Sequence, residues 1–168
     1  IPITVLGLSG GLLAAYWLFV PLRRCLDALD LRILILPHLA RFVGIYFLVL
    51  YSRGLLPRQF ALPAGWGDII IAFGAVALLS NPSALKNKRV LLAWNTLGLL
   101  DILFVVTTAA SIVIPQRDSM AVMTHLPLSL LPTMIVPLII FTHVLIFARL
   151  LASRSTQSPA TRPTTSET

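Results

Sequence analysis

Ionisable side chains inside long apolar stretches are the residues of this sequence whose types and spacing could do chemistry. His38 and Arg41 lie three positions apart within the apolar residues 31–51. Residues three apart share one face of a helix, so these two side chains are expected to point the same way. An arginine at mid-membrane depth costs about 2.5–3.5 kcal/mol on insertion scales, so Arg41 should face the protein interior and pair with another group.

Asp101 is the predicted partner of Arg41. Arg41 lies ten residues from the start of its apolar stretch at 31, and Asp101 lies eleven residues from the start of its own at 90. At about 1.5 Å per helical residue, both reach a depth of about 15–17 Å, close to the centre of a bilayer. Asp68 is expected near the outer surface, capping a helix N-terminus, and is therefore the poorer candidate.

Two histidines complete the set of candidate membrane-embedded groups. By the same count, His38 and His143 lie at one level, about 11 Å from the predicted cytoplasmic boundary, and Asn95 is slightly shallower. Histidines in a bundle can hydrogen-bond between helices, carry a proton together with charged neighbours such as Arg41 and Asp101, or ligate a haem iron. The sequence leaves all three roles open, and each needs both rings to face the bundle interior.

The composition is that of a membrane protein. Hydrophobic residues make up 57% of the chain, charged residues only 11%, and the mean hydropathy is +0.91. Soluble domains carry roughly 25% charged residues. The net charge of +7 comes from basic residues in short loops between apolar stretches, a pattern that signals orientation and argues against nucleic-acid binding. With the single cysteine Cys25, no disulfide can form within the chain.

We predict an all-α polytopic membrane protein in which residues 1–152 form a bundle of five transmembrane helices. Residues 153–168 are rich in Ser, Thr and Pro and are predicted to form a disordered cytoplasmic tail. The predicted helices span about residues 3–20, 31–51, 66–80, 90–114 and 128–151. Pro37 should kink the second helix, and Pro132 and Pro137 should bend the fifth.

Small and polar positions indicate which helix faces are buried. Gly7 and Gly11 form a GxxxG pair in the first helix, for which packing within the chain is favoured over dimerisation. A basic loop should follow that helix at residues 21–24. In the second helix, one face is predicted to be interior; it contains Leu34, His38, Arg41, Ile45 and Leu48.

Residues 52–68 contain two prolines and three glycines, which argues against a continuous helix there. Because the segment is still apolar, it is predicted to be a loop in the membrane interface, with Trp66 at the headgroup level. Trp66, Gly67 and Asp68 would then lie at the outer mouth of the polar core.

Two motifs carry a resemblance to known proteins. They are Gly-Trp-Gly-Asp at residues 65–68 and Trp-Asn-x-x-Gly-x-x-Asp at residues 94–101. With Pro137 and His143, they resemble a family of small bacterial multi-pass membrane proteins that has no assigned activity. The resemblance covers about residues 41–150 and implies a bacterial inner-membrane location, without implying a mechanism.

No motif for soluble-type catalysis is present: the sequence lacks a P-loop, HExxH, a nucleophile elbow and CxxC. The favoured function is non-enzymatic, a polar intramembrane core that binds or conducts a small solute or proton; a membrane-embedded enzyme is left open, although no catalytic constellation is recognisable. The residues predicted to form this core are His38, Arg41, Asn95, Asp101 and His143. No catalytic residue, metal site or cofactor is predicted. The alternatives are a haem b electron-transfer subunit ligated by His38 and His143, and a structural subunit of a larger membrane complex.

The distribution of basic residues predicts an N-terminus outside the cell and a C-terminus in the cytoplasm. Three basic residues lie in the predicted outer loops: Arg53, Arg58 and Arg117. Nine lie at the predicted inner ends: Arg23, Arg24, Arg32, Lys86, Lys88, Arg89, Arg149, Arg154 and Arg162. Such an excess in short loops sets orientation. The expected partners are the lipid bilayer, a small solute or proton, and a second copy or a partner subunit.

Overall fold

The computed structural model describes residues 2–115 and 117–152, and every regular element in those ranges is a helix. In chain order these are α1 (Pro2–Leu18), α2 (Val20–Ala28), α3 (Leu31–Ile35), η1 (Leu36–Phe42), α4 (Val43–Ser52), α5 (Arg58–Ser80), α6 (Pro82–Lys86), α7 (Lys88–Val113), η2 (Arg117–Thr124), η3 (Leu131–Ile135) and α8 (Val136–Ala152). The predicted all-α class is confirmed. The predicted tail, residues 153–168, lies outside the described residues.

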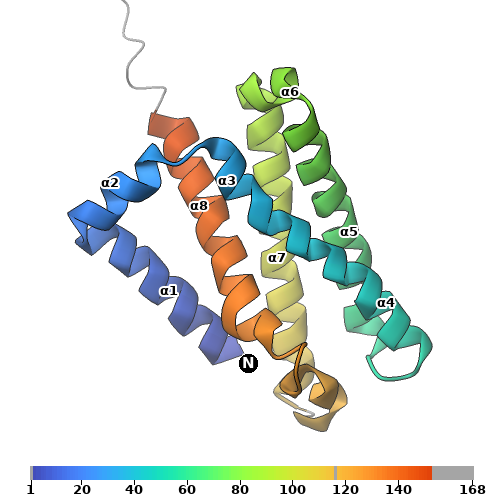
Figure 1. Cartoon of the computed structure of the whole chain (residues 1–168). Helices are drawn as coiled ribbons and strands as arrows, with labels where there is room; N and C mark the ends of the chain where they lie inside the picture. The colour runs from blue at the N-terminus through green and yellow to red at the C-terminus, as the bar shows by residue number, and fades with distance from the viewer. Residues whose placement is uncertain (1, 116, 153–168) are drawn as a thin grey trace, which may run out of the picture.

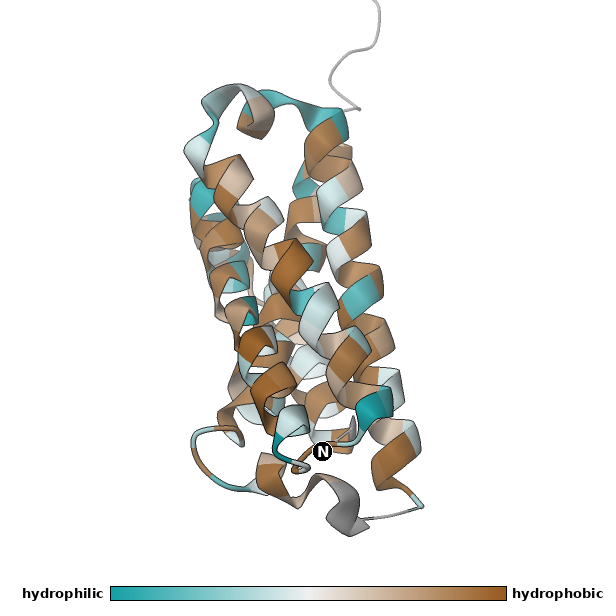
Figure 2. Ribbon diagram, turned by 90° about the vertical axis from the view of Figure 1, so that its right-hand side faces the viewer, coloured by the Kyte–Doolittle hydropathy of each residue, from teal (hydrophilic) through white to brown (hydrophobic). Residues whose placement is uncertain are grey.

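Four helical segments are long and apolar enough to cross a membrane: Leu31–Ser52, Arg58–Ser80, Lys88–Val113 and Leu131–Ala152. They correspond to the second to fifth predicted helices. Hydrophobic residues extend along most of their length, and hydrophilic residues occur at the two ends of the bundle and at separate positions between them (Figure 2). Except at the start of α5, their bounds lie within a few residues of the prediction.

The start of α5 differs most from the prediction. The helix begins at Arg58, contains Pro63, and places Trp66, Gly67 and Asp68 in its interior, so the predicted outer-mouth loop is wrong for these residues. Pro63 lies in the second turn, where it removes one backbone hydrogen bond. Gly65 and Gly67 serve close helix packing instead of a turn: a β-carbon on Gly65 would meet the Leu48 side chain at 2.7 Å. Asp68 is therefore no helix cap, because it lies ten positions into α5.

The helical segment Leu31–Ser52, which we call the second span because it corresponds to the second predicted helix, changes its helical period at Pro37. A kink was predicted at this proline. Residues Leu36–Phe42 form the 3-10 helix η1, in which about three residues make a turn and residues three apart align. The interior face accordingly continues in steps of three, through His38, Arg41, Gly44, Phe47 and Leu50. The predicted interior position is wrong for Ile45, which is exposed, whereas Leu48 is half-buried and packs against Gly65 of α5.

The last span begins with the π-helical turn η3, immediately before Pro137. Proline lacks an N–H and its ring clashes with the carbonyl four residues earlier, so a regular α-helix cannot run through it unchanged. A π turn is one of the local adjustments that accommodate this in membrane helices. The backbone is thus irregular in the region where the two prolines predicted a bend.

The N-terminal region differs from the predicted helix and basic loop. α1 and α2 meet at 97°, and the expected loop is the nine-residue helix α2, which carries Arg23 and Arg24 and buries no residue. α1 lies beside α8 (Figure 1). A β-carbon on Gly7 or Gly11 would meet nothing within 4 Å, so the predicted packing of this face is wrong within the part of the chain that the structure describes.

Two apolar clusters fill the bundle, one towards each end. The first includes Ile35 and Trp94, and the second includes Phe47 and Val105. The second span and α7 both pass from the first cluster to the second, and the intervening residues on each carry the buried polar side chains. The polar residues thus lie between two apolar layers, near the middle of the spans.

Candidate functional site

Polar side chains from four spans meet between the two apolar clusters, and we call this group the polar core. It consists of His38 and Arg41 of η1, Asp68 of α5, Asn95 and Asp101 of α7, and Thr142 and His143 of α8. His38, Asn95 and His143 are 0% exposed and Arg41 is 1% exposed. Groups buried this deeply need hydrogen-bond partners inside the protein, because an unpaired one costs free energy.

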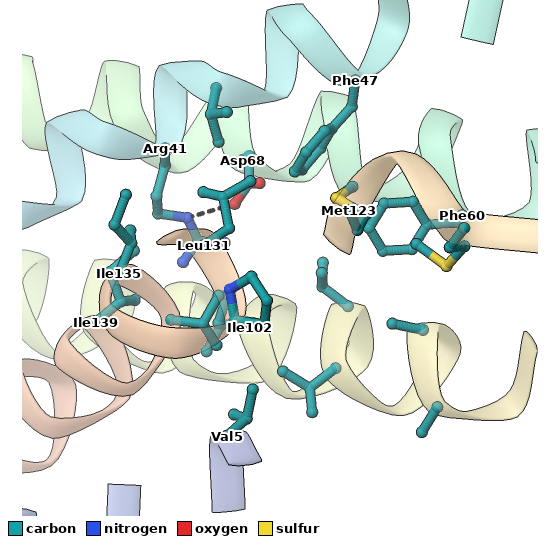
Figure 3. Close-up of a pocket in the computed structure, with 18 of the residues that line it drawn as sticks. Val5, Arg41, Phe47, Phe60, Asp68, Ile102, Met123, Leu131, Ile135 and Ile139 are labelled. Atoms are coloured by element: carbon teal, nitrogen blue, oxygen red, sulfur yellow. Dashed lines mark hydrogen bonds and ion pairs between the residues drawn. The ribbon is translucent and has the colours of Figure 1, made fainter. Parts of the chain in front are cut away.

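Arg41 lies at the centre of the polar core and contacts three groups. Its Nε donates to Oδ1 of Asp68 at 2.7 Å, and its Nη1 donates to the carbonyl of Gly98 at 3.0 Å. Its Nη2 donates to Oδ2 of Asp101. Figure 3 shows the guanidinium and the Asp68 carboxylate turned towards each other. One cation therefore joins two carboxylates from two different helices.

Glycines on the neighbouring helices leave the room that this arrangement needs. A β-carbon on Gly67 of α5 would collide with the Asp101 carboxylate, and one on Gly44 of α4 would collide with the backbone of Gly65. A β-carbon on Gly98 would lie 2.5 Å from Cε1 of His143. Of the three glycines that suggested a loop in the sequence, Gly65 and Gly67 are thus positions of close helix approach, whereas Gly54 lies in the turn before α5 with a φ of 72°.

The two histidine rings are in direct contact, with their centroids 4.2 Å apart. Thr142 Oγ1 lies 3.0 Å from the carbonyls of Leu138 and Ile139, to which its hydrogen is donated, so it accepts from Nε2 of His38 at 3.2 Å. His38 therefore carries its hydrogen on Nε2, and its Nδ1 is an acceptor. Among the described residues, that Nδ1 has no hydrogen-bond partner.

The same reasoning fixes the tautomer of His143. Asn95 donates its Nδ2 to the His143 carbonyl at 3.0 Å, so its Oδ1 accepts from Nδ1 of His143 at 2.8 Å. A neutral imidazole has one N–H, so Nε2 of His143 is the acceptor. This nitrogen, too, is buried without a partner among the residues that the structure describes. The adjoining rings thus present two unpaired acceptor nitrogens.

Gly98 connects the histidine pair to the charged residues. Its carbonyl accepts from Arg41, while its α-carbon lies against the His143 ring. Trp94, one turn earlier on α7, donates its Nε1 to the Ile71 carbonyl at 3.1 Å. The centroid of its ring lies 5.0 Å from that of His38 and 5.8 Å from that of His143. The polar core is therefore continuous from Asn95 to the two carboxylates.

The charges of the polar core do not balance when both acids are ionised. Arg41 contributes one positive charge, whereas Asp68 and Asp101 contribute two negative charges. The Asp68 side chain is 6% exposed and that of Asp101 is 18% exposed, so solvent screens neither fully. An uncompensated charge at such a site is costly. A proton or another cation would neutralise the core.

The structure brings all five predicted core residues together and adds others. The predicted pairing of Arg41 with Asp101 is confirmed, but the ranking of Asp68 as the poorer partner is wrong, because Arg41 binds both acids. Trp66 of the predicted outer mouth is exposed on α5, away from the core. Thr142 was missed, although its position next to His143 was a usable signal.

The ring geometry bears on the haem alternative, which stays an untested prediction. Axial histidines of one haem lie on opposite faces of the porphyrin. The 4.2 Å between the His38 and His143 centroids is a direct ring contact, which leaves no space for a porphyrin between them. Within the described ranges, 2–115 and 117–152, no group of three or more His, Cys, Asp or Glu side chains is placed to hold a metal ion.

The chain belongs to the family described as "Domain of unknown function (DUF8737)", which matches residues 1–151. No curated protein is significantly similar to the chain. No solved structure is significantly similar to it either. The family membership agrees with the predicted resemblance to proteins without an assigned activity.

Proposed function

We propose, for this member of a family of unknown function, that the polar core binds a proton between the spanning helices. The observation that carries the proposal is the histidine pair, in which Nδ1 of His38 and Nε2 of His143 are buried acceptors without donors among the described residues. A proton added to either nitrogen turns an unpaired acceptor into a donor. Intramembrane ionisable groups of this kind mark ion and proton pathways.

Charge balance supports the same proposal. With Arg41 positive and both Asp68 and Asp101 ionised, the polar core has one excess negative charge. One proton bound anywhere in the core, on a histidine or on a carboxylate, makes it neutral. Because an excess charge is costly in a low-dielectric interior, the neutral state is favoured, and loss of the proton must be coupled to entry of another positive charge.

Trp94 provides an internal reporter for this proton, because its ring lies against both histidines. An imidazolium quenches the fluorescence of a neighbouring indole more strongly than a neutral imidazole. The other two tryptophans, Trp17 and Trp66, are 60% and 58% exposed and can be replaced by Phe. The double variant W17F/W66F in lipid nanodiscs should show a fluorescence transition of Trp94 as the pH is lowered from mildly alkaline to mildly acidic.

Variants in the same background identify the proton-binding groups. H143Q should abolish the transition, and D101N should abolish it too, because that core is neutral without a proton. The matched control is H125Q, which changes an exposed histidine of the loop after η2 and should leave the transition intact. A pH-independent Trp94 signal would overturn the proposal and favour purely structural hydrogen bonding between helices, whereas a transition that survives H38Q and H143Q together would place the proton on a carboxylate of the core.

Conduction is tested separately from binding. Liposomes containing the wild-type protein and a trapped pH dye should dissipate an imposed pH gradient faster than liposomes containing H143Q. Equal rates, with the Trp94 transition present, would limit the function to proton binding.

The proposal includes the position of the chain in the membrane. α1 is a fifth span in this proposal, because α1 and α2 together meet the length and hydropathy required, with a 97° bend between them. α2, α6 and the end of α8 lie at one end of the bundle (Figure 1). That end carries Arg23, Arg24, Lys86, Arg89 and Arg149, which favours placing it in the cytoplasm of a bacterial cell with the N-terminus outside.

A further inference from the structure

An apolar cavity of about 70 Å³ extends from the charged end of the polar core along α7 to η2 (Figure 3). One face of α7 lines it from Ile102 to Val113, a length of about 17 Å at 1.5 Å per residue. Met120 and Met123 of η2 line its far end. The cavity is therefore long and narrow.

The wall of this cavity is unsuited to water. One water molecule needs roughly 10–15 Å³ of such a volume, so the 70 Å³ has room for several. Water also needs two to four polar partners, whereas the described side chains around the cavity are apolar apart from Arg41 and Asp68. Apolar cavities of sufficient size stay dry and bind apolar molecules.

The two polar residues of the cavity wall, Arg41 and Asp68, determine which polar end group of a bound apolar molecule fits there. Arg41 has five N–H donors, its bonds to Asp68, Asp101 and Gly98 use one each, and Arg41 and Asp68 both line the cavity at its charged end. A hydroxyl oxygen can accept from the guanidinium and donate to the Asp68 carboxylate, and a carbonyl oxygen can accept from the guanidinium. A carboxylate would add a third negative charge, and an ammonium group would lie against Arg41.

We infer that this cavity binds an uncharged lipid-soluble molecule, made of one hydrocarbon chain that ends in a hydroxyl or carbonyl oxygen at Arg41 and Asp68. The chain extends along α7, with its far end between Met120 and Met123 of η2 and Phe60 of α5. A narrow cavity of this length accommodates a single extended chain. The inference does not depend on proton binding by the histidines, which lie outside the cavity wall.

Photolabelling locates such a ligand directly. The probe is dodecan-1-ol with a diazirine near its methyl end, added to the full chain in nanodiscs and cross-linked by light. Peptide mass spectrometry should find the label on η2 and the last two turns of α7. An excess of unmodified dodecan-1-ol should remove it there and leave the labelling of lipid-facing α5 residues, such as Ile70 and Phe73, unchanged.

Matched variants and probes test the wall and the head group. A109F fills the cavity from α7 and should lower the label on η2 at least tenfold; A93F, at an exposed position of the same helix, should not. The milder A109L covers the case in which A109F does not fold. The head group is tested with probes that have the same chain and diazirine but a different end group, and the label on η2 is divided by the label on α5 for each probe. The methyl ketone should label η2 as strongly as the alcohol does. The carboxylic acid, the amine and the alkane should each label η2 several-fold less.

Three outcomes would overturn the inference: label confined to lipid-facing residues, label on η2 that A109F and A109L leave unchanged, or a charged probe that labels as well as the alcohol. None of them bears on the Trp94 titration, so this inference and the proposed proton binding fail independently.

Discussion

Replacing Arg41 by methionine is the most direct test of how the polar core holds the helices together. The substitution keeps an unbranched, flexible side chain, two atoms shorter than that of arginine, and removes the cation that joins Asp68 to Asp101. Both carboxylates then remain buried without a positive partner. Removing one member of a buried ion pair costs about 3–5 kcal/mol, so R41M should lower the free energy of unfolding by at least that amount.

Removing one acid should cost much less than removing the arginine. In D68N or D101N the amide oxygen can still accept from Arg41, and the core becomes a balanced pair. A charge-assisted hydrogen bond stabilises by about 1.5–3 kcal/mol and a neutral one by about 0.5–1.5 kcal/mol, so each single change should cost about 1–1.5 kcal/mol. The double variant R41M/D101N still leaves Asp68 unpaired and should recover only part of the loss.

The triple variant R41M/D68N/D101N removes all the charges of the core. Because buried ionic groups can often be replaced by neutral ones at little cost, it should be more stable than R41M and within about 2 kcal/mol of the wild type. Stability is measured by reversible unfolding in mixed micelles, followed by circular dichroism. R24M, at an exposed arginine of α2, is the control and should change the free energy by less than about 0.5 kcal/mol. A triple variant no more stable than R41M would refute the charge-based account.

Three further predictions concern packing, hydrogen bonding and orientation. G98A places a β-carbon 2.5 Å from Cε1 and 2.9 Å from Nε2 of His143, and should lower the free energy of unfolding by about 1–3 kcal/mol. G10A is the control and should leave the free energy of unfolding unchanged, because its β-carbon would meet nothing within 4 Å. Equal effects of the two changes would contradict the close packing at Gly98. N95A removes both hydrogen bonds between Asn95 and His143 and should cost about 1–2 kcal/mol; an unchanged unfolding midpoint would speak against them. A green fluorescent protein fused to the C-terminus should fluoresce and alkaline phosphatase fused there should be inactive; an active phosphatase would reverse the proposed orientation.

Much of the fold follows from the sequence because membrane spans are defined by long-range hydropathy. The bounds of α7 and of the last span are close to the predicted ones, and the arginine inside an apolar stretch correctly indicated an interior face and an acidic partner. What the sequence does not reveal is local helical geometry. The 3-10 turn after Pro37 rotates the later part of the second span, so Phe47 is buried in place of Ile45.

The histidine pair marks another limit of prediction. Depth counting placed His38 and His143 at one level, and the structure brings their rings into contact. Which ring nitrogen lacks a partner depends on Thr142, on the side-chain amide of Asn95 and on three backbone carbonyls of α8. These neighbours come from different helices, so the unpaired nitrogens become visible only once the helices are packed.

The position of one helix start decides how the whole core is interpreted. Placing the start of α5 at residue 66, because Pro63 and Gly65 looked like a loop, shifts it by eight residues from Arg58 and moves Asp68 by about 12 Å towards the surface. With Asp68 at the surface, Arg41 and Asp101 form a neutral pair, and nothing requires a proton. With Asp68 at mid-helix, the core holds two acids and one base, and neutrality requires an additional positive charge. Proline and glycine in a membrane helix should therefore be considered first as positions of close packing, because that choice fixes the charge of the interior.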